Sequence, residues 1–269
     1  MRAVMVGAAG RMGAALARLS TQTQAPAVRW VGAIERSDSP AIGQDFGELS
    51  GIAALGVTVS TDLSAALRDA EVMIDFSSAQ RTADHLRAAS QQGVAALVGT
   101  TGLDSSIDAL ARDAAREIPL LIAANTSLGV TLLRELVRMA AQALPSDFDI
   151  EIGDLHHRHK VDAPSGTALA LARSAALGRG IDPAAIDSAP RGSGARRPGQ
   201  IGFAIQRAGD AVGSHAVLFA GTGERLTLSH EATDRTIFAR GALEAAAWLV
   251  GRVPGRYEMS DVIGLKTKV

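Results

Sequence analysis

The chain has 269 residues, of which 47% are hydrophobic, 20% charged and 3% aromatic, and its formal net charge at pH 7 is -1. This length suits one large domain or two modest ones with an aliphatic core, and the composition excludes intrinsic disorder. Because cysteine is absent, the sequence excludes disulfides, cysteine-ligated metal sites and a cysteine nucleophile. The balanced charge and the few aromatic residues argue against nucleic acid as a partner.

The sequence shows neither a targeting segment nor a membrane span. Residues 1–7 form an apolar run that is too short for the apolar core and cleavage site of a signal peptide. The longest apolar stretches, such as Pro119 to Ala124, end well short of a membrane span. We therefore expect a cytoplasmic protein with no membrane partner.

The first half of the chain alternates short β-branched runs with helical stretches rich in alanine and leucine. We expect strands at Arg2–Val6, Val28–Ile34, Val72–Asp75, Ala95–Val98 and Leu120–Ile122, and helices at Arg11–Thr21, Leu63–Arg68, Gln80–Gln92 and Asp104–Ile118. Strands and helices that alternate in this way form βαβ units. The pattern predicts an α/β fold with a doubly wound parallel sheet of the Rossmann type, over residues 1–127.

The pattern changes after Asn125, where a long helix is expected at about Leu128–Leu144. The strands expected next are Asp149–His157, Ile201–Ala208, Val212–Ala220 and Glu224–His230, with helices at Gly166–Leu177 and Arg235–Val250 and a long loop at Gly178–Gln200. Strands that follow one another without helices indicate an antiparallel or mixed sheet. We therefore expect a second, α+β domain with a mixed sheet.

A glycine-rich segment joins the first expected strand to the first helix. It reads Gly7-Ala8-Ala9-Gly10-Arg11-Met12-Gly13. Glycines at such a turn let the backbone approach a pyrophosphate, whose charge is met by the amides of a helix N-terminus. Glu35 ends the next expected strand, where a carboxylate accepts hydrogen bonds from an adenosine ribose. A glycine-rich turn without a ligand is the alternative interpretation.

Arg36 follows Glu35 and bears on the choice of cofactor. A carboxylate alone favours NADH, whereas a neighbouring guanidinium holds the 2′-phosphate of NADPH. The pair indicates that either NADH or NADPH is accepted, although Arg36 is equally explained as a solvated surface residue.

Small polar residues end three further strands expected in the same sheet. The segments are Asp75-Phe76-Ser77-Ser78, Gly99-Thr100-Thr101-Gly102 and Ala123-Ala124-Asn125. Ligands of open α/β sheets bind outside the carboxyl ends of the strands. We expect Gly99 to Thr101 to line the nicotinamide, where a bulky side chain would block the ring. Ordinary turn chemistry is the alternative for each segment.

A basic cluster, His156-His157-Arg158-His159-Lys160, begins at the end of the first strand expected in the second domain and contains three of the six histidines. Such a density of charge is self-repelling, which an anionic partner relieves. Ser165, Gly166 and Thr167 then open the next expected helix and offer backbone amides and hydroxyls. Together these residues predict a carboxylate-binding pocket in which histidine and lysine donate protons.

Three other interpretations of this cluster are weighed. A solvated basic loop explains the charge alone. A metal site through His156 and His159 lacks an evident third ligand, and Arg158 and Lys160 would repel a cation. Ser165 as a nucleophile lacks the pattern of a nucleophile elbow. No metal is therefore expected.

The segment from Glu151 to Ala168, with His156-His157-Arg158-His159-Lys160-Val161-Asp162-Ala163-Pro164-Ser165-Gly166-Thr167 at its centre, resembles the signature of the bacterial dihydrodipicolinate reductases, also called 4-hydroxy-tetrahydrodipicolinate reductases. The resemblance covers essentially the whole chain. It includes Gly7–Gly13, Glu35-Arg36, Gly99–Gly102, Ala123–Asn125, Ile201–Phe203, Arg207–Asp210, Gly223–Arg225 and the tail Tyr257-x-Met259-x-Asp261-Val262.

This resemblance implies an NAD(P)H-dependent oxidoreductase of lysine and diaminopimelate biosynthesis. The implied reaction reduces 4-hydroxy-tetrahydrodipicolinate (dihydrodipicolinate), a small cyclic dicarboxylate, to tetrahydrodipicolinate by hydride transfer to C4. It implies His156 as proton donor and acceptor and Lys160 as a second proton donor. Substrate carboxylate would be bound by His157, Gly166 and Thr167. The cofactor would be bound by Gly7, Ala8, Ala9, Gly10, Arg11, Met12, Glu35, Arg36, Gly99, Thr100, Thr101, Ala123, Ala124, Asn125 and Thr126.

The resemblance also implies an organisation of domains and subunits. Residues 238–269 would complete the dinucleotide-binding domain, and residues 128–237 would form the substrate-binding domain, whose sheet would join four copies into a homotetramer. Thr126 stands where many relatives carry an aromatic residue. A threonine has no ring to stack on the cofactor, so the contact expected at this position is one through the backbone.

Two other classes of function are considered. A nucleotide-sensing Rossmann regulator without catalysis explains Gly7–Gly13 but leaves the cluster His156–Lys160 without a role. A metal-dependent hydrolase would use His156 and His159, and activity that survives chelation would eliminate it.

Overall fold

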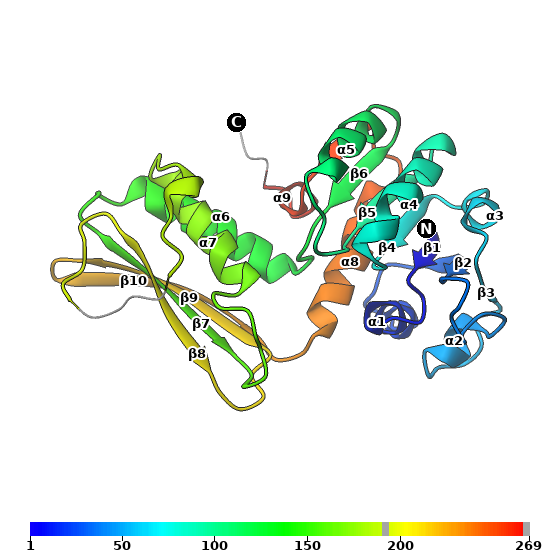
Figure 1. The fold of residues 1–269 in the computed structure, drawn as a ribbon, viewed down its shortest axis with the longest axis horizontal. Helices are drawn as coiled ribbons and strands as arrows, with labels where there is room; N and C mark the ends of the chain where they lie inside the picture. The colour runs from blue at the N-terminus through cyan, green and yellow to red at the C-terminus, as the bar shows by residue number, and fades with distance from the viewer. Residues whose placement is uncertain (190–193, 266–269) are drawn as a thin grey trace. The chain divides into compact units, whose positions relative to one another are not determined.

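The structure is a computed structural model that describes residues 1–189 and 194–265 (Figure 1). The chain divides into two compact units. Unit 1 is formed by Met1–Ser127 together with the segment from Thr236 onward, and unit 2 by Leu128–Arg235. Unit 2 is thus inserted into unit 1 along the chain.

Unit 1 is built on a seven-stranded sheet in which every strand pair is parallel. Its strands are β1 (Arg2–Val6), β2 (Arg29–Ile34), β3 (Val59–Ser60), β4 (Val72–Asp75), β5 (Ala95–Val98), β6 (Pro119–Ile122) and β11 (Gly255–Tyr257). The strand order is β11-β6-β5-β4-β1-β2-β3, so the direction of winding changes between β1 and β4. This order confirms the predicted doubly wound sheet of the Rossmann type.

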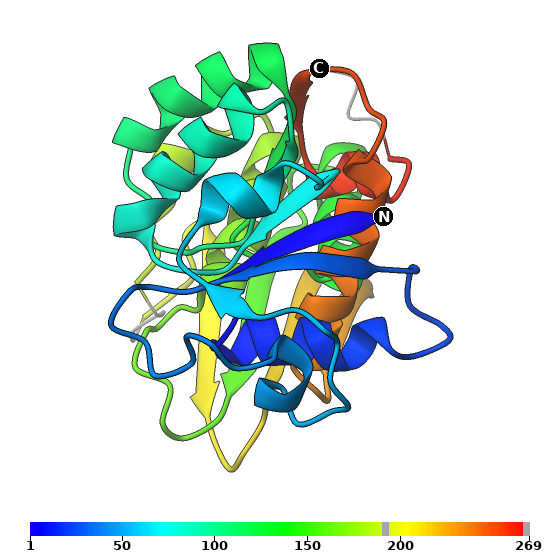
Figure 2. The same cartoon turned by 90° about the vertical axis from the view of Figure 1, so that its right-hand side faces the viewer.

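Helices cover both faces of this sheet (Figure 2). They are α1 (Arg11–Ser20), α2 (Phe46–Leu49), α3 (Leu63–Leu67), α4 (Ala79–Gln91), α5 (Ser106–Glu117), α8 (Thr236–Leu249) and α9 (Met259–Val262). Helix α4 packs beside α5, and α1 packs beside α8. The elements α2, β3, β11 and α9 were not expected, because segments of two to four residues are too short to show a helical or strand period.

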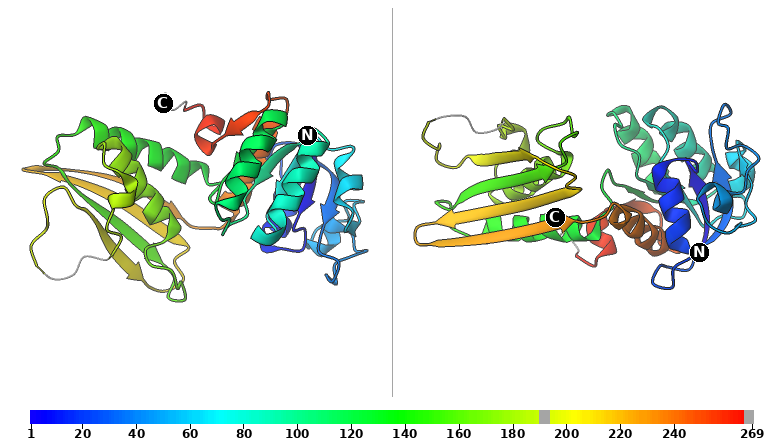
Figure 3. Two further views of the ribbon diagram at one scale, coloured as in Figure 1. Left: turned by 45° about the horizontal axis from the view of Figure 1, so that its top comes forward. Right: turned by 90° about the horizontal axis from the view of Figure 1, so that it is seen from below.

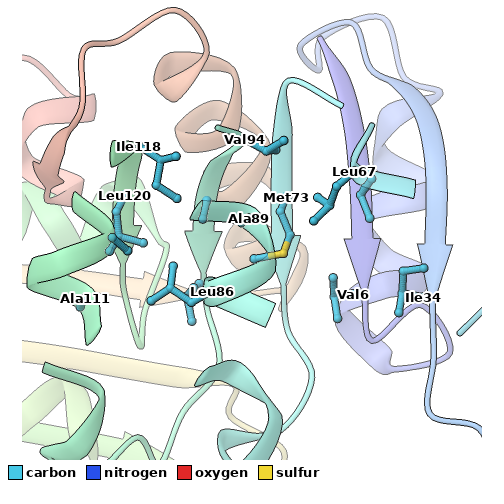
Figure 4. Close-up of a cluster of buried hydrophobic side chains, with 14 residues drawn as sticks. Val6, Ile34, Leu67, Met73, Leu86, Ala89, Val94, Ala111, Ile118 and Leu120 are labelled. Carbon is cyan, nitrogen blue, oxygen red and sulfur yellow. The ribbon is translucent and has the colours of Figure 1, made fainter. Parts of the chain in front are cut away.

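The core of unit 1 is aliphatic, as the composition predicts. Strands β4 and β5 are buried at every position, as is typical of parallel strands with helices on both faces. Figure 4 shows the cluster of side chains that fills the space between strands and helices; its labelled members are Val6, Ile34, Leu67, Met73, Leu86, Ala89, Val94, Ala111, Ile118 and Leu120.

Unit 2 contains a four-stranded mixed sheet with two helices on one face (Figure 3). Its elements are α6 (Leu128–Ala143), β7 (Asp149–His156), α7 (Gly166–Gly178), the 3₁₀ turn η1 (Pro183–Ala185), β8 (Ile201–Arg207), β9 (Gly213–Gly221) and β10 (Glu224–Ala232). The strand order is β10-β9-β7-β8, with β7 and β8 parallel and the other pairs antiparallel. This confirms the predicted mixed sheet.

The two faces of this sheet differ in burial. Along β7 buried and half-buried residues alternate, and Ile150 and Ile152 point into the core beneath α6 and α7. No helix in the described part of unit 2 packs on the other face, which we call the open face. It carries Gly153, Leu155, Ala204, Ala216 and Leu218, all partly or fully exposed.

The expected loop at Gly178–Gln200 begins one residue late, because Gly178 ends α7, and it contains η1. Its residues 190–193 lie outside the described part of the chain. Beyond them Arg196 returns to β7, where its guanidinium pairs with Asp149 and Glu151 at 3.1 Å each. Within the described residues, no helix combines the length and apolarity needed to cross a bilayer.

Candidate active site

The glycine-rich loop after β1 forms a tight backbone turn. Gly7 has a φ of 85°, and a Cβ atom there would lie 2.8 Å from the backbone oxygen of Phe76. A Cβ on Gly13 would collide with the loop backbone. Both positions therefore require glycine, and the turn is closed by Gly10 N, which donates to Gly7 O over 3.1 Å. The other predicted residues of this segment, Ala8, Ala9, Arg11 and Met12, lie on the turn and the start of α1.

Glu35 lies beside this loop, directly after β2. Its Oε1 accepts a hydrogen bond from Ala9 N over 2.8 Å, and its Oε2 accepts one from Arg36 N over 3.2 Å. The guanidinium of Arg36 is exposed and pairs with Asp38 at 3.3 Å. The structure therefore brings together the loop and the carboxylate that the sequence assigned to one cofactor site.

A buried carboxylate joins the ends of β4 and β5. Asp75 is fully buried, and its Oδ1 accepts hydrogen bonds from Ser77 N and Ser77 Oγ over 2.9 and 2.6 Å. Its Oδ2 lies 3.0 Å from Nδ1 of the buried His85, and Thr100 Oγ1 lies 3.3 Å from Oδ1. The sequence showed Asp75 at a strand end but gave no role to His85. Through Ser77 and Thr100, the carboxylate of Asp75 joins the loop after β4 to the loop after β5.

The loop after β5 contains the residues predicted to line the nicotinamide. A Cβ on Gly99 would collide with the ring of Phe76. A small residue at this position is therefore favoured by Phe76 as well as by the expected nicotinamide. The side chain of Thr100 is buried against Asp75, whereas Thr101 is exposed. Of these three residues, Thr101 therefore offers an accessible side chain, and Gly99 offers backbone alone.

Side-chain to backbone hydrogen bonds fix the segment that follows β6. Asn125 Oδ1 accepts a hydrogen bond from Ser127 N over 2.9 Å. Thr126 is buried, and its hydroxyl donates to the backbone oxygen of Phe238 in α8 over 2.6 Å. The four residues predicted here to contact the cofactor, Ala123, Ala124, Asn125 and Thr126, follow β6 directly.

In unit 2, His156 ends β7 and lies beside a buried carboxylate two residues earlier. The Nδ1 atom of His156 is 2.8 Å from Oδ1 of Asp154, whose side chain is 0% exposed. The other oxygen, Oδ2, accepts a hydrogen bond from Ser165 N over 2.8 Å and lies 3.3 Å from Nη2 of Arg207. On the adjacent strand β9, Nε2 of His215 lies 3.4 Å from Oδ1. Four elements therefore converge on one carboxylate.

The protonation of this pair is set by burial and by neighbouring charge. Burial lowers the pKa of His156, and the charge of Asp154 opposes this effect. Burial alone would raise the pKa of Asp154, but hydrogen bonds from His215 and Ser165 hold it well below its usual range. Asp154 is therefore a carboxylate at neutral pH.

Lys160 lies on the loop that follows His156. Its Nζ is 2.8 Å from Oδ1 of Asp162, and its side chain is 20% exposed. This contact lowers the pKa of Asp162. The backbone oxygen of Asp162 is in turn held by Arg207 over 2.7 Å. The loop thus places an ammonium group close enough to His156 to lower the pKa of the imidazole.

The predicted carboxylate-binding residues lie at the start of α7 and beside the basic loop. Ser165 caps α7 through its hydroxyl, which accepts a hydrogen bond from Ala168 N over 3.2 Å, and Gly166 and Thr167 form the first turn. The Nε2 atom of His157 lies 3.4 Å from Nη2 of Arg235. An open hollow of about 780 Å³ is lined by His157, Arg158, His159, Gly209 and Asp210.

Sequence reasoning missed the partners of His156. Asp154 was visible in the motif without a role, Ser165 was assigned only to the helix start, and His215 stands far along the chain, opposite Asp154 on β9. Only strand register could have placed it there. Asp154, His156 and His215 are spaced closely enough to be considered as metal ligands. Arg207 lies 3.3 Å from the carboxylate of Asp154, and its guanidinium would repel a cation bound there.

Comparison with known proteins agrees with this arrangement of units. The family model "Dihydrodipicolinate reductase, N-terminus" matches residues 1–126, and "Dihydrodipicolinate reductase, C-terminus" matches residues 129–263. A 4-hydroxy-tetrahydrodipicolinate reductase from Sinorhizobium medicae is 50% identical over 98% of this chain and 98% of its own. One from Methylocella silvestris is 50% identical over 100% of this chain and 99% of its own.

A solved structure shares the fold over nearly its full length. It is a dipicolinate-bound dihydrodipicolinate reductase from Paenisporosarcina sp. TG-14, with a TM-score of 0.78, 23% identity, and coverage of 98% of this chain and 99% of that chain. Because both family models match and full-length relatives are identical at about half of all positions, this chain belongs to the dihydrodipicolinate reductase family.

Proposed function

We propose that this chain reduces 4-hydroxy-tetrahydrodipicolinate, or the dihydrodipicolinate formed from it by loss of water, to tetrahydrodipicolinate with NADH or NADPH. The observation that carries this proposal is that His156 and Ser165 at the start of α7 share the carboxylate of Asp154, while Lys160 lies close enough to lower the pKa of His156. This cluster lies in a chain of the dihydrodipicolinate reductase family. It supplies proton donors and an anion-binding helix start in one place.

Unit 1 fits a dinucleotide cofactor. Glycine is required at Gly7 and Gly13 for close backbone approach, and Glu35 stands beside the loop, where its carboxylate suits the ribose hydroxyls. When bound, the nicotinamide supplies the hydride. We assign cofactor contacts to Gly7, Ala8, Ala9, Gly10, Arg11, Met12, Glu35, Arg36, Gly99, Thr100, Thr101, Ala123, Ala124, Asn125 and Thr126, and we assign residues 1–127 with 238–269 to the dinucleotide-binding domain.

Unit 2 fits a small dicarboxylate. Gly166 and Thr167 begin α7, where backbone amides and the helix dipole favour a carboxylate. His157 adds a side chain beside the guanidinium of Arg235. The solved relative carries dipicolinate, a planar ring with two carboxylates, which supports the same class of ligand here. We therefore assign residues 128–237 to substrate binding.

Proton delivery falls to His156 and Lys160. Reduction at C4 places negative charge on the neighbouring part of the substrate, and a proton must be added beside the reduced carbon. The positive charge of Lys160 stabilises the negative charge that develops on the substrate, and His156 donates the proton. No step in this scheme requires a metal ion.

We further propose a homotetramer joined through the open face of the unit 2 sheet. The middle of this face carries small and aliphatic residues, among them Gly153, Ala204, Ala216 and Leu218, and charged residues such as Glu151 lie beside them. Exposed apolar surface of this kind is typical of an interface between subunits. We also propose a cytoplasmic location, where reduced nicotinamide cofactors are maintained.

The decisive experiment mixes the purified protein with freshly prepared substrate and each reduced cofactor and follows the loss of the cofactor's absorbance. We expect oxidation that depends on the substrate and survives a chelator. No oxidation with either cofactor would overturn the proposal, and cofactor binding without oxidation would favour a regulator.

A further inference from the structure

The carboxylate of Asp154 is more deeply buried than any proton donor in the site, and it makes no contact with solvent. A charged group in this position is unfavourable unless several partners compensate for its lost hydration. Asp154 has such partners on three other elements: Ser165 at the start of α7, Arg207 on β8 and His215 on β9. The fold therefore fixes this carboxylate in place.

We propose that Asp154 is a positioning residue for His156: it holds the imidazole through Nδ1, so that Nε2 is the nitrogen that exchanges a proton with the substrate. The exchange rests on the proposed function, whereas the orientation of the ring does not.

The first support is the short distance between two buried polar atoms, Nδ1 of His156 and Oδ1 of Asp154. Nδ1 of His156 and Oδ1 of Asp154 are both buried, and among the described residues neither has a hydrogen bond of standard geometry, with the other or with any third group. They lie 2.8 Å apart. A buried donor or acceptor left unpaired is unfavourable, and a carboxylate oxygen 2.8 Å from Nδ1 favours a proton on that nitrogen. A neutral His156 then carries its lone pair on Nε2.

The second support is the space left around Nε2. Gly213 begins β9, and a Cβ atom built on it would lie 3.0 Å from Nε2 of His156. This distance is shorter than an ordinary van der Waals contact. A side chain on residue 213 would therefore crowd Nε2, and glycine at this position keeps that edge of the ring free of a side chain.

The third support is the charge around the ring. His215 on β9, Arg207 on β8 and Lys160 on the following loop each lower the pKa of His156, as burial does. Asp154 acts in the opposite direction. Asp162 pairs with Lys160, and His230 lies close enough to His215 for the charge of His215 to lower the pKa of His230. Without Asp154, His156 would lose its proton at a lower pH.

The test is the isosteric substitution Asp154→Asn, which removes the charge and leaves an oxygen for Ser165 N. We expect kcat to fall about 10- to 100-fold, while KM for the substrate and the Kd of NADH stay close to wild type. We also expect the decline of kcat at high pH to begin at a lower pH, because protonated His156 is the acid. Asp154→Glu restores the charge and is expected to recover part of kcat.

Asp149→Asn is the matched control. Asp149 lies on the same strand and is also paired with an arginine, Arg196, but it is remote from His156 along β7. It is expected to leave kcat and the pH profile unchanged. A merely structural role for Asp154 would lower thermal stability without moving the pH profile.

Nuclear magnetic resonance of the imidazole nitrogens tests the orientation in the wild-type protein, without any variant and without activity. We expect neutral His156 to carry its proton on Nδ1. A proton on Nε2, or an Asp154→Asn variant with unchanged kcat and pH profile, contradicts the proposal. Loss of wild-type activity on chelation would also overturn it, since Asp154, His156 and His215 would then be metal ligands. Wild-type protein that oxidises no cofactor refutes the proposed function alone, and the nitrogen resonances still decide the orientation.

Discussion

At His156, the alternation of a β-strand determines which groups share the active-site face. Residues two apart on β7 point to the same side, so Asp154 and His156 both face the core while Leu155 lies on the open face. The motif predicted His156 and Lys160 as proton donors without any structure. It could not predict His215, whose place opposite Asp154 depends on the register between β7 and β9.

Replacing His156 with alanine is expected to lower turnover about 10²- to 10⁴-fold, the usual contribution of a general acid. Binding of NADH is expected to be unchanged, because His156 lies in unit 2 and the assigned cofactor residues lie in unit 1. Steady-state kinetics and a fluorescence titration with NADH measure the two effects. Wild-type turnover in this variant would refute the assignment of His156.

Replacing Glu35 with alanine is expected to weaken NADH binding more than NADPH binding. The carboxylate suits a ribose that carries free hydroxyls, whereas Arg36 remains available for a 2′-phosphate. The variant also removes the acceptor of Ala9 N, so a modest loss common to both cofactors is expected as well. Titrations with each cofactor test this prediction, and equal losses for both would contradict the ribose contact.

At the scale of single elements, the length of a helix or strand determined whether its position could be predicted from the sequence. Strands β1, β4 and β5 have the bounds expected from sequence, because each is a run of apolar residues ended by polar or glycine residues. The short α2 is instead stabilised by Asp45, which accepts hydrogen bonds from Gly47 N and from the more distant Leu55 N. Such a cap depends on the path of the following loop, which the sequence pattern does not reveal.

The turn between β5 and its following helix is expected to tolerate no side chain at Gly99. A methyl group there collides with Phe76, so Gly99→Ala should destabilise unit 1 by about 1–3 kcal/mol and weaken NADH binding. Thermal unfolding and NADH titration measure these effects. Gly255→Ala on β11 is the matched control, because its Cβ would meet Tyr257 at an ordinary 3.5 Å. Equal stability of the two variants would contradict the prediction.

The histidines beneath the unit 2 sheet are expected to make stability depend on pH. Burial lowers the pKa of both His156 and His230, so the unfolded chain binds more protons than the folded one just below the ordinary histidine pKa of about 6.5. Their contribution is fully present above that pH and declines as the pH falls below it. We expect Tm to drop between pH 7.5 and 5.5. His230→Gln should reduce this drop, and an unchanged slope in that variant would rule out its contribution.

At the scale of the whole molecule, the fold class and the order of the longer elements followed from the sequence, because alternating strands and helices admit few topologies. The assembly depends instead on one face of one sheet. Replacing Leu218 with glutamate puts a charge on the open face, and we expect a mass below four times 27.7 kDa by analytical ultracentrifugation. Gln22→Glu, at an exposed turn of unit 1, is the control. A tetramer that survives Leu218→Glu would exclude this face as the interface.

The insertion of unit 2 into unit 1 has a consequence for the order of synthesis. Helix α8 packs against α1, β4 and β5, yet the ribosome makes it only after all of Leu128–Arg235. Until then, the first 127 residues expose the apolar surface that α8 later covers. Unit 2 is therefore expected to fold first, on a nascent chain whose cofactor unit is still incomplete. Limited proteolysis of ribosome-bound chains that end near Arg235 should cleave the first unit and spare the second.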